Sequence, residues 1–381
     1  MHLLLGIIYL AFISLGLPDS LLGSAWPVLS VDLHLPLSSS GIIFMIISAG
    51  TVISSLNADR LLRKYSTGVL TAVSTGITAG ALFGFSVSRS LTELCFWAVP
   101  YGLGAGCIDT ALNNYVALHY ETRHMNWLHC MWGIGASVGP YLMSLALVQN
   151  AGNWQGGYRI VGFIQLLLTA VLFATLSLWK AEKEEKTGEK KEVLSLKKIL
   201  SVPGVTEMMI TFFCYCALEQ TAGLWASSWL VHAKGVAEVP AAAYASFFFT
   251  GITLGRALCG FLSYKCNDKQ MIRLGLLIVT IGLCGMLQNF SVTLNEAGLI
   301  LLGLGCAPVY PSLIHTVPAK FGAAHSQAII GLQMASAYIG TSFMPPLFGW
   351  LIRMLPISVF PYYLLLLTGL MILFHEKLQK R

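Results

Sequence analysis

Charged residues are scarce in this sequence. Asp, Glu, Lys and Arg together make up 10% of its 381 residues, whereas ordinary soluble domains carry roughly 25%. Hydrophobic residues make up 56%, and the mean hydropathy is +0.71. Because a single soluble core cannot bury that much apolar surface, the composition excludes an ordinary soluble domain.

Sequence signs of catalysis and of metal binding are also lacking. The sequence has no HExxH motif, and we find no carboxylate pair of the kind that a membrane enzyme would need near one interface. Its nine cysteines form no CxxC pair and no Cys/His cluster with zinc spacing. We therefore expect no enzyme activity, no metal and no organic cofactor.

Long apolar runs fill the chain instead, and many reach the roughly 20 residues that a helix needs to cross a bilayer. The runs cover residues 3–27, 39–58, 67–87, 91–118, 126–149, 158–179, 204–232, 241–263, 271–290, 296–317, 326–352 and 358–375. They predict an all-α polytopic membrane protein with twelve transmembrane helices. No small-residue cleavage site follows the first run, so we expect it to stay in the protein as a helix.

The basic residues are distributed unevenly between the two sides of these helices. Of the 23 Lys and Arg residues, 18 fall on the side that holds both chain ends, four fall on the other side, and Arg256 lies within a run. Basic residues near helix ends are kept on the cytoplasmic side, so both termini are predicted to be cytoplasmic. The net charge of +6 then reflects topology, and we expect no nucleic-acid partner.

One long polar stretch interrupts the apolar pattern and divides the chain. The segment KAEKEEKTGEKKEVLSLKK at 180–198 predicts a six-helix bundle over 1–180, a charged cytoplasmic linker over 181–198 and a second bundle over 199–381. The halves echo each other at an offset of about 200 residues. The matches are Gly102-Leu103-Gly104 with Gly303-Leu304-Gly305, Asp19 with Glu219, and Lys64 with Lys265. Such an echo indicates duplicated units related by an axis along the membrane normal.

The polar segment between the second and third runs carries a recognisable motif. Its sequence, Ser55-Leu56-Asn57-Ala58-Asp59-Arg60-Leu61-Leu62-Arg63-Lys64, resembles the GxxxDRxGRK signature of the major facilitator superfamily. Ser55 and Leu62 stand where that signature has glycines. A weaker echo in the second half consists of Gly255, Arg256, Lys265 and Asp268. The resemblance implies a secondary transporter in which Asp59, Arg60, Arg63, Lys64 and Arg256 act in gating rather than in solute contact.

Three carboxylates lie inside the apolar runs, namely Asp19, Asp109 and Glu219. An acid within a span is costly, so it is a functional candidate by default. Burial disfavours the charged form, so such a group can bind a proton on one side of the membrane and release it on the other. The alternative is that each is a neutral acid or an ion pair that holds helices together.

A narrower resemblance concerns the fucose/proton symporter branch of the superfamily. Ile108-Asp109-Thr110-Ala111-Leu112-Asn113 is similar to its LETAAN segment, with Asp in place of Glu, and Leu17 to Leu22 is similar to its first span. Phe213 to Tyr215 with Gln220 to Ala222, and Asn126, add to the likeness. Gly16 stands where the fucose permease has an amide. The resemblance implies proton-coupled uptake of a sugar-like solute, with Asp109 as the coupling acid and the proton as the only coupling ion.

A polyol solute needs hydrogen-bonding groups and flat apolar faces around it. The candidates in the expected central cavity are Asp19, Asn113, Asn114, His129, Gln220, Trp225, Tyr310 and Gln333, together with Trp26. The Trp residues are equally typical of the membrane interface. We expect a monosaccharide as the solute, the lipid bilayer as surroundings, a monomer, and location in the plasma membrane, as a bacterial inner-membrane protein.

The main rival interpretation is a drug/proton antiporter. Gly135-Ala136-Ser137-Val138-Gly139-Pro140 matches part of the GxxxGPxxGG exporter signature, but Met143 and Ser144 replace its final glycines. Close helix packing through small residues explains the same stretch and is the favoured interpretation. A sensor that does not transport is disfavoured, because the loops are short and the runs leave no room for a further soluble domain.

Overall fold

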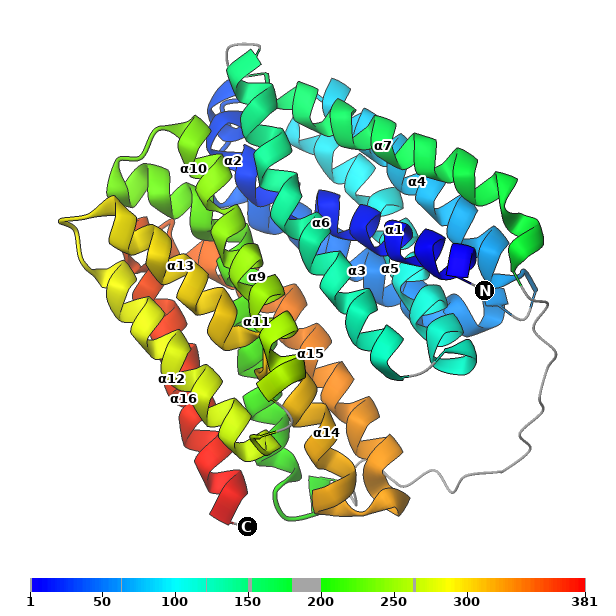
Figure 1. Cartoon of the computed structure of the whole chain (residues 1–381). Helices are drawn as coiled ribbons and strands as arrows, with labels where there is room; N and C mark the ends of the chain where they lie inside the picture. Colours follow the sequence, from blue (N-terminus) through cyan, green and yellow to red (C-terminus); the bar gives the residue numbers. More distant parts are fainter. Residues whose placement is uncertain are drawn as a thin grey trace.

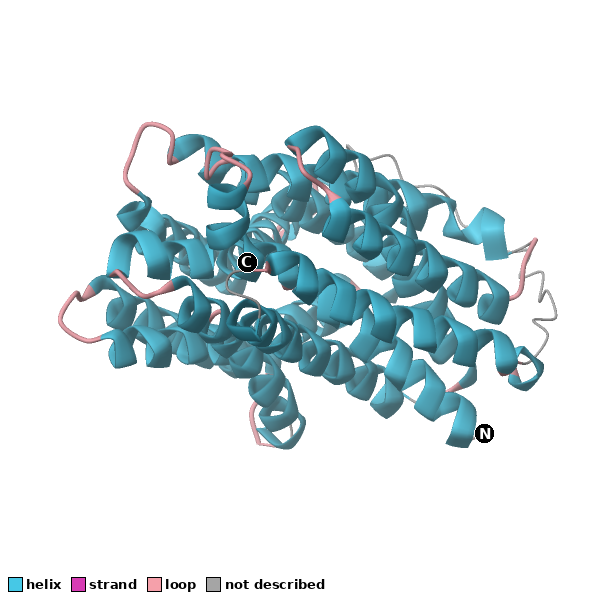
Figure 2. Ribbon diagram, turned by 90° about the horizontal axis from the view of Figure 1, so that it is seen from above, coloured by secondary structure: helices cyan, strands magenta, loops and turns pink. Residues whose placement is uncertain are grey.

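The computed structural model describes residues 2–62, 64–120, 122–149, 153–179, 200–262 and 265–380. Within these ranges the side chains at 2, 59, 60, 117, 118, 122, 123, 125, 126, 149 and 323–328 are not described. Helices account for all the regular secondary structure of the described residues, as the view in Figure 2 shows. The prediction of an all-α fold is confirmed.

The N-terminal half contains seven α-helices (Figure 1). They are α1 (His2–Asp19), α2 (Leu21–Asp32), α3 (Ser39–Leu62), α4 (Thr67–Val87), α5 (Leu91–His119), α6 (Thr122–Gln149) and α7 (Trp154–Ala174), followed by the short η1 (Leu176–Leu178). The first predicted span is thus two helices, broken at Ser20. Pro18 lacks the N–H that would donate to Ser14 O in the helix, and that oxygen accepts from Gln165 Nε2 at 2.7 Å instead.

The C-terminal half repeats this order of long helices. They are α9 (Val205–Lys234), α10 (Glu238–Tyr244), α11 (Ser246–Leu262), α12 (Asp268–Leu287), α13 (Val292–Cys306), α14 (Val309–Phe321), α15 (Ala323–Leu351), η2 (Ile357–Val359) and α16 (Phe360–Lys380). The tenth predicted span is also broken, between α13 and α14, where Pro308 caps the second piece. Each predicted span therefore corresponds to one long helix or to two helices that are nearly continuous.

Most of these helices can cross a membrane by length and composition. Ten stretches of the described residues are long and apolar enough to do so. The helices α9 and α15 bring the number to twelve, since they have 30 and 29 residues and are each about 45 Å long. The fold is that of a twelve-helix membrane protein.

The two halves pack their helices in the same pattern. In the N-terminal half α3 and α4 pack on α5, α4 packs on α7, and α1 packs on α6. In the C-terminal half α11 and α12 pack on α13, α12 packs on α16, and α9 packs on α15. Each helix of the first half thus has a counterpart with equivalent neighbours in the second.

The repeated Gly-Leu-Gly stretches mark equivalent helix contacts in the two halves. A Cβ atom added to Gly102 would lie 2.2 Å from the backbone oxygen of Ile47 in α3, and one added to Gly303 would lie 1.9 Å from that of Phe248 in α11. The second glycines behave alike, because Gly104 lies against α4 and Gly305 against α12. The sequence repeat therefore records two pairs of backbone approaches that admit no side chain.

The halves meet along α6 and α11, with further contacts of α2 with α9 and α10 and of α3 with α15. We call the α6–α11 contact and its continuation to α10 the seam. At one end of the seam, Ser144 Oγ donates to Val239 O at 3.1 Å. Ser137 and Thr253 meet in its middle, and at the other end Arg256 Nη1 donates to His129 O at 3.2 Å.

The seam closes one end of the molecule. We name the end with the 33–38, 88–90 and 235–237 connections the outer end, and the end where α1 begins and α16 terminates the inner end. From Arg256 toward the inner end, Phe261 is 76% exposed and a Cβ atom on Gly260 would meet nothing within 4 Å. The described polar contacts of the seam thus lie toward the outer end, and that of Arg256 is the innermost of them.

The repeated glycines generate a stability prediction. Gly102→Ala and Gly303→Ala should each destabilise the protein by about 1–3 kcal/mol, because the added methyl group overlaps a backbone oxygen that cannot move away. The measurement is the temperature at which half of the detergent-solubilised protein leaves its monodisperse chromatographic peak. Gly369→Ala in α16 is the control, since its added Cβ meets nothing within 4 Å. Equal midpoints for all three variants would contradict the proposed packing.

Candidate functional site

Asp19 lies at the break between α1 and α2, near the centre of the bundle. Its carboxylate accepts hydrogen bonds from Tyr101 Oη in α5 and from Trp132 Nε1 in α6, both at 2.8 Å. The side chain is exposed to solvent although protein atoms surround it on all sides. The carboxylate therefore faces a water-accessible space inside the protein.

Asp109 lies two helical turns along α5 from Tyr101 and is half-buried. Asn113 Nδ2 donates to its Oδ1 and to its backbone oxygen, each at 2.9 Å. The predicted pairing of Asp109 with the amide one turn later is confirmed. Asp109 is also close enough to Asp19 for the two carboxylates to interact electrostatically.

Residues of the C-terminal half approach Asp109 from the other side. Tyr310 in α14 and Tyr338 in α15 both interact electrostatically with it. Tyr338 also reaches Ser55 in α3 and is 37% exposed. The sequence analysis missed Tyr338, because nothing in the pattern of α15 separates it from a residue that packs against a neighbouring helix.

Among the described residues, Glu219 has a basic partner, unlike the other two acids. Its Oε1 lies 3.9 Å from Arg256 Nη2, and the carboxylate is buried in α9. Arg256 was expected to act in gating and Glu219 in proton coupling. The structure places their side chains next to each other. This arrangement corresponds to the alternative in which the acid forms an ion pair that holds helices.

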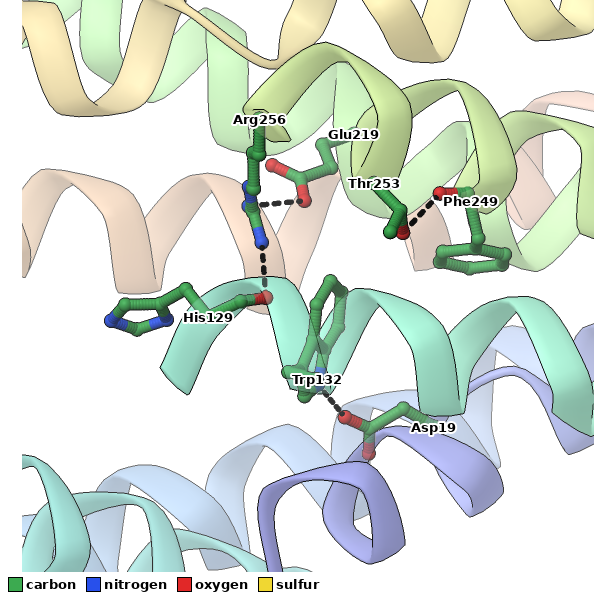
Figure 3. A network of polar contacts seen from close by, with 7 residues as sticks. All are labelled: Asp19, His129, Trp132, Glu219, Phe249, Thr253 and Arg256. Atoms are coloured by element: carbon green, nitrogen blue, oxygen red, sulfur yellow. Dashed lines mark hydrogen bonds and ion pairs between the residues drawn. The ribbon is translucent and has the colours of Figure 1, made fainter. Parts of the chain in front are cut away.

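Trp132 connects the Asp19 and Glu219 sites, as Figure 3 shows. Its indole nitrogen donates to Asp19, and the guanidinium carbon of Arg256 lies 5.5 Å from the centre of its ring. A continuous series of polar contacts thus runs from α5 through α1, α6 and α11 to α9. The sequence analysis did not single out Trp132, since its partners are 113 and 124 positions away in the chain.

The other predicted binding residues differ in their surroundings and exposure. His129 is half-buried, its ring meets Phe12 edge-on at 5.9 Å, and its backbone oxygen accepts the Arg256 bond. The Tyr310 hydroxyl donates to Met334 Sδ at 3.6 Å. Asn114 is exposed and Gln220 is half-buried.

Three candidates lie away from the accessible space in this conformation. Trp225 is fully buried, and its Nε1 donates to Pro345 O at 3.0 Å. Trp26 is fully buried as well and donates to Leu37 O at 2.7 Å. Gln333 is fully buried, and its amide has no hydrogen-bond partner among the described residues. The Trp26 bond lies within the N-terminal half and the Trp225 bond within the C-terminal half.

The predicted gating residues are mostly beyond the structural description. Arg63 and the side chains of Asp59 and Arg60 lie outside the described residues. Lys64 is exposed, with its Nζ 5.4 Å from the centre of the Tyr65 ring. Ser55, which replaces a glycine of the motif, donates to Gly106 O in α5 at 3.3 Å.

Gly16 shows why an amide is absent at this position of α1. A Cβ atom there would lie 2.1 Å from the backbone oxygen of Trp132 and 2.9 Å from the backbone nitrogen of Ala136. The close contact of α1 with α6 excludes every side chain. The groups that bind solute must therefore come from elsewhere.

Comparison with known proteins agrees with this architecture. The sequence profile of the Major Facilitator Superfamily matches residues 8–287, well over half of the chain. The chain belongs to the Major Facilitator Superfamily. A variant of the nucleoside transporter NupG has the same fold, with a TM-score of 0.79, 14% identity and 98% of each chain covered. The family and these relatives are transporters, so this superfamily member is a transporter and not an enzyme.

Relatives in sequence include proteins named for sugar transport. The Glucose/mannose transporter GlcP of Bacillus subtilis is 21% identical over 95% of this chain and 92% of its own length. The Sodium-dependent glucose transporter 1 of Homo sapiens is 23% identical over 69% of this chain, and the Bypass of stop codon protein 6 of Saccharomyces cerevisiae is 24% identical over 68%. The matched region spans 57% of the human protein and 56% of the yeast protein.

The Gly16 contact generates the prediction for this site. Gly16→Gln should lower the yield and the thermal stability of the purified protein, because the side chain has no room between α1 and α6. Gly6→Gln on the same helix is the control and should leave both unchanged, since a Cβ atom there meets nothing within 4 Å. The measurement is the thermal midpoint of each variant in detergent. A Gly16→Gln protein with wild-type stability would show that the helices can separate at this point.

Proposed function

We propose that this superfamily member is a secondary active transporter that takes up a sugar or sugar-like small solute together with protons by alternating access. One observation carries the proposal. Asp19 and Asp109 interact electrostatically with each other, and the described hydrogen bonds to their carboxylates come from neutral groups. The names of the bacterial and human relatives support a sugar as the solute class.

The groups around the two acids suit a polyhydroxylated solute. Asn113 supplies an amide, and Tyr310 and Tyr338 supply aromatic faces with hydroxyl groups. Sugar rings present hydroxyl groups at their edges and apolar C–H groups on their faces, so they need both kinds of partner. A monosaccharide bound by a single copy of the chain is the simplest proposal.

Asp109 is proposed as the proton-coupling acid. A carboxyl group among apolar helices without a cation beside it favours its neutral form. Asn113 can donate to the ionised group or accept from the protonated one, so the side chain keeps a partner in both states. Binding of the solute nearby can therefore be linked to binding of a proton, and no other cofactor is required.

Alternating access is proposed to use the seam. With the seam closed the two acids are accessible from the inner end, and separation of α6 from α11 would make them accessible from the outer end. Solute and proton shift the balance between these states only as far as they bind one state more tightly than the other. Asp59, Arg60, Arg63 and Lys64 are proposed to set the same balance at the inner end.

The coupling role can be tested in proteoliposomes with D-glucose as the probe. Asp109→Asn should lose accumulation driven by an imposed pH gradient but retain counterflow exchange, because exchange requires solute-bound alternating access and no proton release. Asp19→Asn should weaken uptake from the outer side. Asp32→Asn is the matched control, since Asp32 accepts from Trp154 at the outer end of α2, away from both acids. Gradient-driven accumulation at the wild-type level in Asp109→Asn would transfer the coupling role to Glu219.

Drug export remains the second candidate, but the exporter-like stretch has a structural explanation. A Cβ atom on Gly135 would lie 1.9 Å from Ile13 O, and one on Gly139 would lie 2.3 Å from Leu17 O. Both contacts join α6 to α1 within one half. The stretch therefore serves helix packing, as favoured from the sequence.

We propose that the inner end is cytoplasmic, in a bacterial inner membrane, because the basic residues concentrate there. Lys186→Cys, in the linker outside the described residues, should react with an impermeant maleimide only after the cells are permeabilised. Phe290→Cys is the control, since residue 290 is 83% exposed in an outer connection and should react in intact cells. Labelling is measured above that of the wild-type protein. Reaction of Lys186→Cys in intact cells would reverse the orientation.

A further inference from the structure

We propose that Trp132 is a positioning residue that couples the state of Asp19 to the seam between the two halves. The inference rests on the proposed alternating-access cycle, because it assigns one step of that cycle to a single side chain. Trp132 belongs to α6, which contributes both to the site and to the seam. It contacts the acid with its edge and the seam with its face.

The position of Trp132 relative to Asp19 is fixed by the backbone. The Trp132 oxygen lies against Gly16 of α1, where it would be 2.1 Å from an added Cβ atom. Three residues further along α1, Asp19 accepts the indole N–H at 2.8 Å. Because α1 and α6 are held together at this point, the indole ring can respond to Asp19 only by changing its orientation.

The face of the same ring contacts the innermost element of the seam. The Arg256 guanidinium carbon lies 5.5 Å from the ring centre, within the range of a cation–π interaction. Arg256 also donates to His129 O at 3.2 Å, whereas its distance to the Glu219 carboxylate is 3.9 Å. The ring and the carbonyl oxygen, both in α6, thus hold the guanidinium to the opposite half.

The strength of the Asp19 contact depends on what else binds Asp19. A carboxylate accepts an N–H bond more strongly than a protonated acid does. A solute hydroxyl at the carboxylate would compete for the same oxygens. Either event weakens the constraint on the ring, which then no longer presents its face to Arg256. Among the described residues, the titratable or charged groups that surround this path are Tyr101, Asp109, His129, Cys130, Tyr215, Cys216, Glu219, Arg256, Cys259, Cys306 and Tyr310.

If the contact of Arg256 with Trp132 is lost, the halves would begin to separate at the innermost point of the seam. The next contact toward the outer end is between Ser137 and Thr253, whose oxygens are 3.5 Å apart and at the limit of a hydrogen bond. Gly133, one residue after Trp132, lies directly against Thr253. The contact of Trp132 with Arg256 is therefore the first contact of the seam that a change at Asp19 would weaken.

The test is a double-mutant cycle that needs neither a sugar nor a gradient. The full chain is placed in nanodiscs with spin labels attached through p-acetylphenylalanine at positions 89 and 290. These positions lie in outer connections of opposite halves, and the nine cysteines stay unchanged. Electron–electron distance measurements in alkaline buffer give the populations of the closed and open outer end. The variants are Asp19→Asn, Trp132→Phe and the double variant.

Asp19→Asn should raise the ratio of open to closed outer ends about tenfold, a typical coupling between two sites. Trp132→Phe keeps an aromatic face but lacks the N–H, so it should raise the ratio by itself. The double variant should show no further rise. Trp26→Phe is the matched control, because Trp26 donates to Leu37 O instead. On that background Asp19→Asn should keep its full effect.

Two outcomes would overturn the proposal. One is an Asp19→Asn effect that is undiminished on the Trp132→Phe background, and the other is the lack of any Asp19→Asn effect in the otherwise wild-type chain. If Trp132→Phe does not fold, Arg256→Gln replaces it in the cycle, with the same expectation. If the cycle shows the coupling but the protein transports no D-glucose, the proposed solute is wrong and this inference stands. If the protein transports D-glucose but the Asp19→Asn and Trp132→Phe effects are independent, the proposed solute stands and this inference is wrong.

Discussion

A carboxylate placed among apolar helices constrains much of this structure. An ionised group in such surroundings is destabilised by several kcal/mol unless fixed donors replace its water. For Asp19 those donors are the Tyr101 hydroxyl and the Trp132 indole, which come from two other helices of the same half. The break in the helix after Pro18 places the carboxylate where both can reach it. The three helices are thereby fixed around one acid, and Asp109 of α5 interacts with it electrostatically.

Close helix contacts provide the rigid frame for these polar groups. At Gly16, Gly135, Gly102 and Gly303 the neighbouring backbone approaches so closely that no side chain fits. Backbone contacts of this kind are short and stiff, so each half holds its polar groups in fixed positions. Between the halves, the described polar contacts of the seam include one that is 3.5 Å long. A junction weaker than the halves it joins is what the proposed alternating access requires.

The sequence predicted features that depend on local order and on composition. The spans follow from apolar length, and the pairing of Asp109 with Asn113 follows from the helical repeat. It could not predict contacts between distant segments. Glu219 and Arg256 were assigned to separate roles, Trp132 was overlooked, and Trp225 was expected at the solute although it is buried against Pro345. Each of these depends on how helices pack, which a single sequence does not encode in its spacing.

The break after Pro18 has a consequence for the direction of the electric field at the site. Asp19 is the last residue of α1 and α2 begins at Leu21, but Ser20 between them keeps a right-handed helical conformation, and its oxygen still accepts from Ser24 N at 3.3 Å. The dipoles of the two helices therefore run in the same direction, and the carboxylate lies at neither free end of a helix. The backbone thus gives no strong bias to the charge of this acid, which leaves the Tyr101 hydroxyl and the Trp132 indole as the dipoles that act on it.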